Sequence, residues 1–340
     1  MKTEHFVIIG NGAAGNRAAD VLRTGEPDAR ITLISDEFIH FYYRHRLSDF
    51  LAGDCEESDL LVRSSEEYRE QRIRLRLGQR VVRVDFPKKT LYLQHMEVIR
   101  YDRLLLCVGG RPRVPEIYYA CRDRFTVFKT VEDARHFRRK LAEVDRVVIV
   151  GGDLISLKVA EVLVRLGKKV SFLVDRDAFW PLEADDGVRH ELSERLTAKG
   201  IEVVGDDGLA LVESAGRAGL RVSTRAGRTI PCEMVGAFFG LVPAVDFLLG
   251  SGLDIDRGIL VDEYLQTSVP GVFAAGDCAQ VYNPAIRNYW VSIGWPNARL
   301  LGEVAALNML GQGRRADHVP VNALEMDGLV VNTCWWRRLQ

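Results

Sequence analysis

Two glycine-rich turns hold the residues of this sequence that are best suited to chemistry. The first turn reads Gly10-Asn11-Gly12-Ala13-Ala14-Gly15. A pyrophosphate needs glycine in such a turn, because a Cβ would keep the backbone N–H groups and the helix N-terminus from reaching it. Asp36 and Glu37 follow about 20 residues further on, where a dinucleotide site has the carboxylate that binds ribose. We therefore predict a dinucleotide site here rather than a purely structural turn.

The second turn is a degraded copy of the first. It reads Gly151-Gly152-Asp153-Leu154-Ile155-Ser156, with Asp153 and Ser156 where glycine would suit a phosphate better. The Asp153 carboxylate either lies where phosphates would sit or turns back to cap the following helix, and the sequence favours the cap. Farther on, Asp175 suits a ribose hydroxyl and Arg176 a 2′-phosphate, although a solvated charge pair is an equal alternative.

Both turns lie inside β–α–β patterns that would position them. In each pattern, short apolar runs typical of buried strands flank a segment with helical periodicity. The segments are Phe6–Ile9, Ala13–Leu22 and Ile31–Ile34, then Val147–Val150, Leu154–Leu166 and Val170–Val174. Parallel strands joined by a helix place both turns at the carboxyl ends of their strands, where doubly wound sheets bind ligands. We predict an α/β fold with two Rossmann-like dinucleotide-binding domains.

The remaining apolar runs predict that the second domain is inserted into the first. Leu104–Val108 has the pattern of a buried strand and is broken by Gly109–Pro112, which cannot continue a strand or helix. Val235–Phe239 then leads into a return crossing, and Gly271–Ala275 reads as a last strand of the first domain. The predicted domains are residues 1–112 with 241–315, residues 113–240, and a tail at 316–340.

Composition narrows the classes of partner. The 340 residues carry a net charge of −1, so no global field would attract nucleic acid or an anionic membrane. No apolar run approaches the roughly 20 residues that span a bilayer. The six cysteines are scattered, with no C-x-x-C pair for a dithiol centre or a metal site. The chain begins Met-Lys-Thr-Glu, unlike a signal peptide, and we expect a cytoplasmic protein without a metal site.

With these motifs in place, the chain resembles the FAD-dependent pyridine nucleotide-disulfide oxidoreductase superfamily, and within it the rubredoxin reductase, NADH oxidase and nitrite reductase large-subunit branch. The resemblance runs from Phe6 to about Met326 and implies a glutathione-reductase-like fold. Thr267–Asp277 is similar to the family's second FAD signature, Leu104–Pro112 to its domain crossing, and Gly294–Ala298 with Ala305–Met309 to the helix that closes over the flavin. The implied cofactors are FAD and either NAD(H) or NADP(H).

The resemblance also assigns binding roles to individual positions. For FAD these positions are Gly10, Gly12, Ala13, Ala14, Gly15, Asp36, Glu37, Arg44, Val82, Cys107, Val108, Gly109, Arg111, Gly276, Asp277, Gly294 and Trp295. For the pyridine nucleotide they are Gly151, Gly152, Leu154, Ile155, Asp175 and Gly240.

Three departures from the family's pattern qualify these roles. First, Phe41–Ser48 holds no redox cysteine, which is similar to the electron-transferase branch; Arg44 or Arg46 would stabilise anionic reduced flavin there, unless the loop is merely a solvated basic one. Second, Lys158 stands where the family often has glutamate, so this cation contacts flavin, a partner or solvent. Third, the chain stops at Gln340 without most of the C-terminal interface domain. Its tail is expected to dock a partner or to fold onto its own chain.

These expectations combine into a hypothesis of function. The chain is expected to transfer electrons between NAD(P)(H) and an iron–sulfur acceptor or donor, as the flavin subunit of a larger complex. Two alternatives stay open at this point. One is an NADH oxidase that makes peroxide, and the other is a non-catalytic, FAD-stabilised structural or regulatory subunit.

Overall fold

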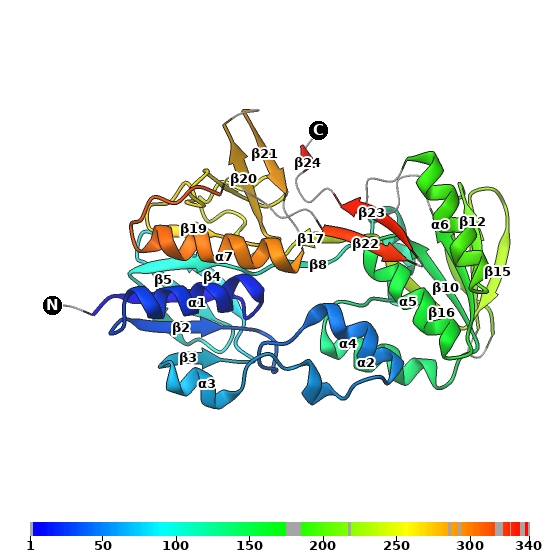
Figure 1. Cartoon of the computed structure of the whole chain (residues 1–340), viewed down its shortest axis with the longest axis horizontal. Helices are drawn as coiled ribbons and strands as arrows, with labels where there is room; N and C mark the ends of the chain where they lie inside the picture. The colour runs from blue at the N-terminus through cyan, green and yellow to red at the C-terminus, as the bar shows by residue number, and fades with distance from the viewer. Residues whose placement is uncertain are drawn as a thin grey trace.

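The computed structural model describes residues 3–174, 185–216, 219–284, 287–291, 294–316, 322–326, 328–333 and 337–338. A parallel five-stranded sheet forms the centre of the first unit, in the order β19-β7-β1-β2-β3 (Figure 1). Its central strands are almost wholly apolar because both faces of a parallel sheet are covered. The strands are β1 His5–Ile9, β2 Arg30–Ile34, β3 Ile73–Arg76, β7 Arg103–Leu106 and β19 Val272–Ala274.

The second unit repeats this plan with a parallel five-stranded sheet in the order β12-β11-β10-β16-β9. Each unit also carries a three-stranded antiparallel sheet, between β3 and β7 in the first unit and between β12 and β16 in the second. The main strands are β9 Phe125–Thr126, β10 Arg146–Gly151, β11 Lys169–Val174, β12 Glu202–Gly205 and β16 Met234–Phe238. The small sheets are β4 Val81–Asp85, β5 Thr90–Leu93 and β6 Val98–Arg100, and β13 Leu209–Ser214, β14 Leu220–Thr224 and β15 Thr229–Cys232.

The order of strands along the chain shows the insertion that the sequence predicts. The chain forms β1 to β7, crosses to build the whole second sheet, and returns so that β19 pairs with β7. The α/β class and the doubly wound architecture are therefore confirmed. The exact domain boundaries stay a prediction.

Gly109–Pro112 does not continue the buried strand, as expected, but part of it forms a new short strand. The strand β7 does end early, at Leu106, but β8 Gly110–Pro112 then pairs antiparallel with β17 Leu241–Pro243. A two-stranded ribbon consists only of edges, where proline is tolerated although it has no N–H to donate. The outgoing and returning chains thus join in one ribbon between the units (Figure 1).

Seven helices are assigned within the described residues, and α1 and α7 pack together most closely in the first unit. A Cβ added at Gly302 would lie 2.2 Å from the Ala14 carbonyl oxygen, so glycine permits this approach. The helices are α1 Ala13–Gly25, α2 Leu47–Ala52, α3 Ser65–Glu70, α4 Val131–Leu141, α5 Leu154–Arg165, α6 Asp186–Ala198 and α7 Trp295–Met309. Short 3-10 helices are η1 Arg44–Arg46, η2 Glu57–Leu60, η3 Glu116–Arg124 and η4 Asp246–Leu248.

Although α2 precedes the first crossing in the chain, its apolar side chains belong to the core of the second unit. Leu47, Phe50 and Leu51 are buried in one cluster with side chains of α4 and α5. Two ion pairs reinforce this contact at its rim: Arg165 to Asp54 at 2.6 Å and Arg135 to Glu57. The segment after β2 therefore fastens the two units to each other, as Figure 1 shows where α2 lies beside α4.

The described part of the C-terminal segment contacts both units. The hairpin of β22 Asn322–Met326 and β23 Leu329–Thr333 places Met326 in the core of the second unit, and Arg195 of α6 donates a hydrogen bond to the Met326 carbonyl at 3.2 Å. Beyond it, β24 Arg337–Arg338 joins the sheet β18-β20-β21-β24. The other strands of that sheet are β18 Ile259–Val261, β20 Ala279–Asn283 and β21 Asn288–Val291. A docking role for this segment stays a prediction.

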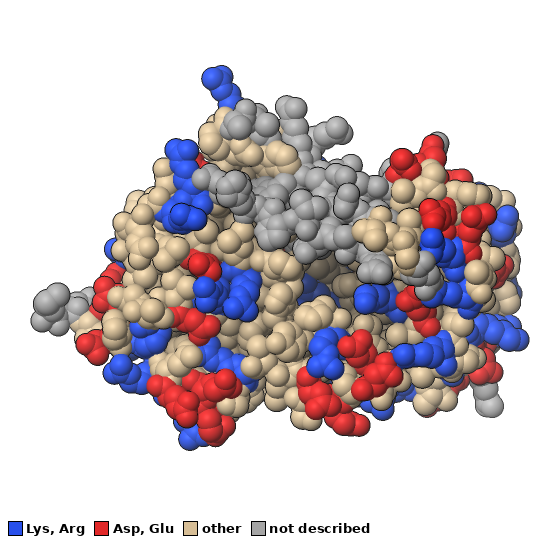
Figure 2. Space-filling model, in the orientation of Figure 1, with Lys and Arg blue, Asp and Glu red and all other residues tan. Residues whose placement is uncertain are grey.

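The surface carries both signs of charge. On the face in Figure 2, basic and acidic side chains are interspersed, in keeping with the net charge of −1. None of the described helices is long and apolar enough to cross a membrane.

The contact between α1 and α7 generates a stability prediction. Gly302→Ala should lower the free energy of unfolding by about 1–3 kcal/mol, because the new methyl group is forced against the α1 backbone. Gly187→Ala in α6 is the matched control: its Cβ would meet nothing closer than 3.4 Å, so better helix propensity should stabilise by about 0.5–1 kcal/mol. Urea unfolding measures both, and equal effects of the two substitutions would contradict the packing argument.

Candidate cofactor site

The first glycine turn leaves the N-terminus of α1 open. Gly10 has φ 120°, and a Cβ there would lie 2.0 Å from the Cys107 carbonyl oxygen. A Cβ at Gly15 would lie 2.0 Å from the Gly10 carbonyl oxygen, so these two glycines hold helix and strands close together. Gly12 is the N-cap residue, and no side chain caps the helix. A Cβ at Gly12 would meet nothing within 4 Å, so there is free space beside this uncapped helix end.

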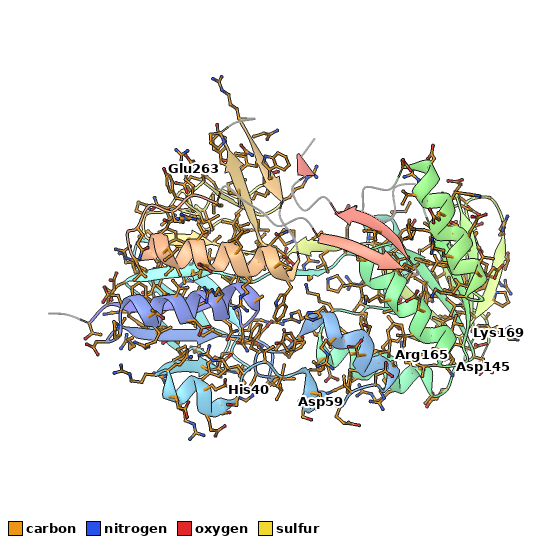
Figure 3. The ribbon with its side chains drawn as sticks, viewed as in Figure 1. His40, Asp59, Asp145, Arg165, Lys169 and Glu263 are labelled. Atoms are coloured by element: carbon orange, nitrogen blue, oxygen red, sulfur yellow. The ribbon has the colours of Figure 1, made fainter. Side chains whose placement is uncertain are left out.

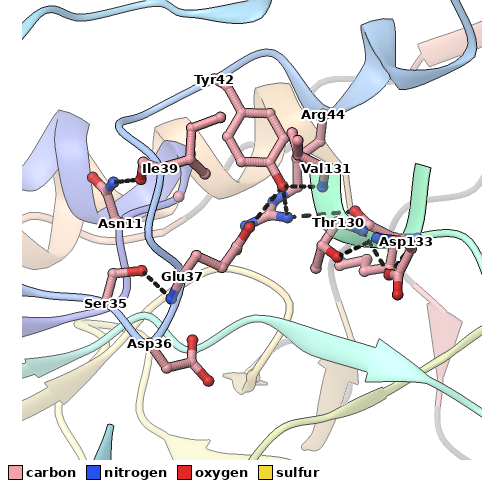
Figure 4. A network of polar contacts seen from close by, with 12 residues as sticks. Asn11, Ser35, Asp36, Glu37, Ile39, Tyr42, Arg44, Thr130, Val131 and Asp133 are labelled. Atoms are coloured by element: carbon pink, nitrogen blue, oxygen red, sulfur yellow. Dashed lines mark hydrogen bonds and ion pairs between the residues drawn. The ribbon is translucent and has the colours of Figure 1, made fainter. Parts of the chain in front are cut away.

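Glu37, Tyr42 and Arg44 form a polar network at the carboxyl end of β2 (Figure 4). The Tyr42 hydroxyl donates to the Glu37 carboxylate at 2.9 Å, and Arg44 contacts both Glu37 and Tyr42. Burial opposes the charge of Arg44, but Tyr42 and Glu37 raise the pKa of its guanidinium above the ordinary value. Arg44 is therefore a fixed cation. Asp36, which precedes Glu37 in the chain, does not join this network. It forms an ion pair with Arg80 at the surface, at 3.3 Å.

The same network reaches the second unit. The backbone N–H of Val131, at the start of α4, donates to the Tyr42 hydroxyl at 3.3 Å, and Arg44 donates to the Lys129 carbonyl at 3.4 Å. Thr130 and Asp133 form a capping box that fixes this end of α4. The loop before α4 is thereby held against the loop after β2.

Lys129 is a site residue that the sequence reasoning missed. Burial lowers the pKa of its ammonium, while Asp277 and Glu37 oppose that shift and Arg44 adds to it. Lys129 and Arg44 are thus two cations close to the Asp277 carboxylate. The available signal was the pattern Thr130-Val131-Glu132-Asp133 after an apolar run, which marks a helix start directly beyond a strand end.

The N-terminus of α7 completes this region. Gly294, with φ 103°, donates its N–H to the Asp277 carboxylate at 3.3 Å. Trp295 stacks on Phe41, with ring centroids 5.0 Å apart and nearly parallel planes. Tyr43 and His45 pack around the same indole at 5.5 Å. The loop after β2 and the start of α7 therefore form an aromatic wall beside the Asp277 carboxylate.

The two other predicted catalytic residues lie outside the Arg44 network. Arg46 contacts Asp49 at 3.3 Å and donates to the Asp59 carbonyl at 2.9 Å. Lys158 is exposed on α5, where it lies near enough to His45 to lower the pKa of that imidazole, after the larger effect of burial.

The remaining residues predicted to bind FAD differ in exposure and in their contacts. Among the FAD candidates, Val82 is half exposed on β4, and Arg111 forms an ion pair with Asp246 at 3.1 Å in the crossing ribbon. Burial raises the pKa of the Cys107 thiol well above its ordinary value, so this sulfur is inert. Val108, Gly109 and Gly276 belong to the segments that follow β7 and β19.

Two candidates for the nucleotide lie at the edge of the second unit or beyond its described part. Gly240 accepts a hydrogen bond from Arg113 through its carbonyl at 2.9 Å in the crossing. Asp175 lies outside the described residues.

The second glycine turn has the same frame but a closed helix end. A Cβ at Gly151 would lie 1.9 Å from the Phe238 carbonyl oxygen, and Gly152 donates to that oxygen at 3.1 Å. Asp153 is the N-cap residue of α5, and its carboxylate accepts from the Ser156 N–H at 2.8 Å. The cap is thus the alternative that the structure adopts. Burial raises the pKa of Asp153 to about 6. Leu154 and Ile155 form the first turn of the helix.

Both turns face the region between the units. Asp145 and Lys169 mark the amino ends of β10 and β11 at the outer edge of the second unit, so the carboxyl ends point inward (Figure 3). Lys129 lies near enough to interact electrostatically with two carboxylates of this region, those of Asp153 and Asp277. The described residues contain no cluster of three or more His, Cys, Asp or Glu that could hold a metal ion.

The residues at the first turn fit the FAD that the resemblance implies. An uncapped helix N-terminus and an empty position at Gly12 suit a pyrophosphate. The second turn fits a pyridine nucleotide only in its backbone frame. Its helix end already holds a carboxylate.

Comparison with known proteins identifies the family of the chain. Residues 4–294 match the family model described as pyridine nucleotide-disulphide oxidoreductase. The chain is 29% identical to putidaredoxin reductase CamA of Pseudomonas putida over 93% of its own length and 76% of that protein. It is 32% identical to the ferredoxin–NAD(+) reductase component of an anthranilate 1,2-dioxygenase system of Burkholderia cepacia, over 92% of its own length and 77% of that protein. The crystal structure of a covalent putidaredoxin reductase–putidaredoxin complex matches with a TM-score of 0.88 at 26% identity, covering 98% of this chain and 81% of that chain.

The open end of α1 generates a binding prediction. Gly12→Asp should fold, because Gly12 already has the extended conformation that any residue adopts and has free space around it. The new carboxylate should nevertheless repel a pyrophosphate and cap the helix in its place, so the purified protein should lose at least nine-tenths of its FAD. The absorbance at 450 nm per chain measures this loss. Gly109→Asp is a poor control because of its positive φ, whereas Gly205→Asp, in open space on β12, should keep its FAD.

Proposed function

Because the chain belongs to the pyridine nucleotide-disulphide oxidoreductase family, whose enzymes use FAD and NAD(P)H, we propose that it transfers electrons between NAD(P)H and an iron–sulfur protein. The observation that carries the proposal is the open N-terminus of α1 beside a fixed cation and an aromatic wall, with no thiol among them. The relatives named above are reductases of this kind, and one was crystallised with its putidaredoxin partner.

The chain's own residues have distinct tasks in this proposal. When bound, FAD accepts a hydride and releases single electrons. The N-terminus of α1 holds its pyrophosphate, and Asp277 together with the start of α7 positions its other end. Arg44 is held by Glu37 and Tyr42, so it stabilises negative charge without having to reorganise. Phe41 and Trp295 exclude water from one side of the site.

A thiol relay plays no part in the proposal. The described cysteines, which are Cys55, Cys107, Cys121, Cys232 and Cys278, are all buried and free. Burial raises the pKa of Cys107, Cys232 and Cys278, so their thiols stay protonated and unreactive. Free buried thiols of this kind also support a reducing compartment, and we place the protein in the cytoplasm on that ground. A stable complex with further redox subunits stays a prediction.

Anaerobic stopped-flow absorbance tests the proposal. The yellow holoprotein is mixed with NADH or with NADPH, then with an oxidised [2Fe–2S] ferredoxin. Bleaching at 450 nm within the first second by one nucleotide, followed by reoxidation when ferredoxin is added, is the expected result. Bleaching that is reversed only by oxygen would favour a peroxide-making oxidase instead. Silence with both nucleotides would overturn the proposal and favour an FAD-stabilised subunit without catalysis.

Arg44 should determine how readily the site accepts electrons. Arg44→Gln is expected to slow flavin bleaching at least tenfold and to make the midpoint potential of the flavin more negative, because it removes a fixed cation. Arg44→Lys should recover part of both effects. Arg46→Gln is the matched control, since Arg46 pairs with Asp49 and should leave rate and potential within a factor of two. Spectroelectrochemistry on FAD-replete protein separates this result from a loss of cofactor, and an unchanged potential in Arg44→Gln would refute the role.

A further inference from the structure

The two glycine turns have closely similar backbones at the N-cap but differ in side chains, notably Asp153 in place of Gly12 and Ser156 in place of Gly15. Gly12 and Asp153 are the N-cap residues of α1 and α5, and each stands two positions after the first glycine of its turn. Their backbones agree closely, with φ −92° and ψ −167° at Gly12 and φ −82° and ψ 171° at Asp153. The two helix ends therefore share the backbone of the cap, and the Asp153 carboxylate is the anion that α5 carries and α1 lacks.

That side chain occupies the position that a phosphate takes at an open helix end. The Asp153 carboxylate accepts from the Ser156 N–H at 2.8 Å, and the Ser156 hydroxyl donates to the Asp153 carbonyl at 2.5 Å. Ser156 is itself fully buried. A free N–H group and a favourable helix dipole are what draw a pyrophosphate to such a turn, and here an anion already uses both.

Lys129 is the second observation that points to a ligand here. Its ammonium lies near enough to Asp153 to favour the charged carboxylate, and Asp277 and Glu37 are the other carboxylates that favour the charge of Lys129. A partly exposed cation is therefore placed close to the closed helix end. It can receive the carboxylate when it leaves the cap, or the phosphate that replaces it.

We propose that Asp153 is an intramolecular competitor of the pyridine nucleotide: its carboxylate must leave the N-terminus of α5 before the pyrophosphate can use that end, and Lys129 is the cation that both anions share. This inference rests on the proposed function in one respect, namely that the second turn is the nucleotide site. It makes Asp153 the residue that sets nucleotide affinity, and it predicts a nucleotide site that is weak for its fold.

Equilibrium binding of NAD⁺ and of ADP-ribose to the oxidised, FAD-loaded protein tests the proposal by isothermal titration calorimetry. Asp153→Gly should bind both at least tenfold more tightly than the natural protein, and Asp153→Asn should lie between them. Asp185→Gly is the matched control, because Asp185 caps α6 through the Val188 N–H at the same distance of 2.8 Å but is exposed. It should lose similar stability without changing the affinity.

The outcomes separate this proposal from the proposed function. Affinities of Asp153→Gly within threefold of the natural protein would overturn the competition, even where NADH bleaches the flavin rapidly. Tighter binding by Asp153→Gly would support the competition, even where no nucleotide bleaches the natural flavoprotein. Failure of every variant to bind either probe would also overturn it, since an opened helix end should then suffice.

A pH dependence follows from the same geometry. The groups that face the Asp153 carboxylate are the N–H groups of Ile155 and Ser156 on α5 and the Lys129 ammonium from the loop before α4. Arg44, Glu37 and Asp277 are the other charged groups that act on Lys129. Because burial raises the pKa of Asp153 to about 6, the competing charge is present at pH 8 and is largely neutralised at pH 5.5. The affinity for ADP-ribose should therefore rise severalfold as pH falls over this range. Asp153→Asn should remove the dependence, and an unchanged slope in that variant would contradict it.

Discussion

The contact of Glu37 and Tyr42 with Arg44 is the interaction on which the candidate site depends. It holds the loop after β2 against the start of α4, because the same hydroxyl accepts from Val131 and the same guanidinium reaches the Lys129 carbonyl. The adjoining α2 then buries its apolar face in the second unit. One partly buried network thus fixes the distance between two glycine turns that lie on separate sheets, and it fixes a cation beside the Asp277 carboxylate in the same step.

The sequence predicts the frame of this molecule well, because glycine turns and apolar runs report on local geometry. Gly10, Gly15 and Gly151 have the close backbone contacts that their types suggest, and the strands begin and end within about two residues of the expected positions. The cap formed by Asp153 is also local, since it joins residues three apart, and it could be weighed as an alternative from the sequence alone.

What the sequence does not reveal is how distant segments meet. The helix α2 reads as part of the first unit, yet it packs on α4 and α5 of the second. Just after it, Glu57 pairs with Arg135, which lies 78 positions onward. Lys129 is one cation among 46 basic residues, and only the fold brings it between Asp153 and Asp277. The ribbon of β8 and β17 pairs a proline-containing segment with another, which no propensity favours. Long-range pairing, rather than local preference, determines each of these features.

The two helix ends also differ in what their stability depends on. A helix N-terminus next to a ligand site leaves its N–H groups without partners until an anion arrives, so the first unit gains stability when its ligand binds. The second unit carries its own anion at Asp153. Because the folded-state pKa of that carboxyl is raised from 3.8 to about 6, its ionisation opposes folding as pH rises through that range, and the bond to Ser156 offsets only part of the penalty. The capped N-terminus of α5 therefore lowers the stability at neutral pH but needs no ligand. The open N-terminus of α1 instead makes the stability of the first unit depend on the cofactor that it binds.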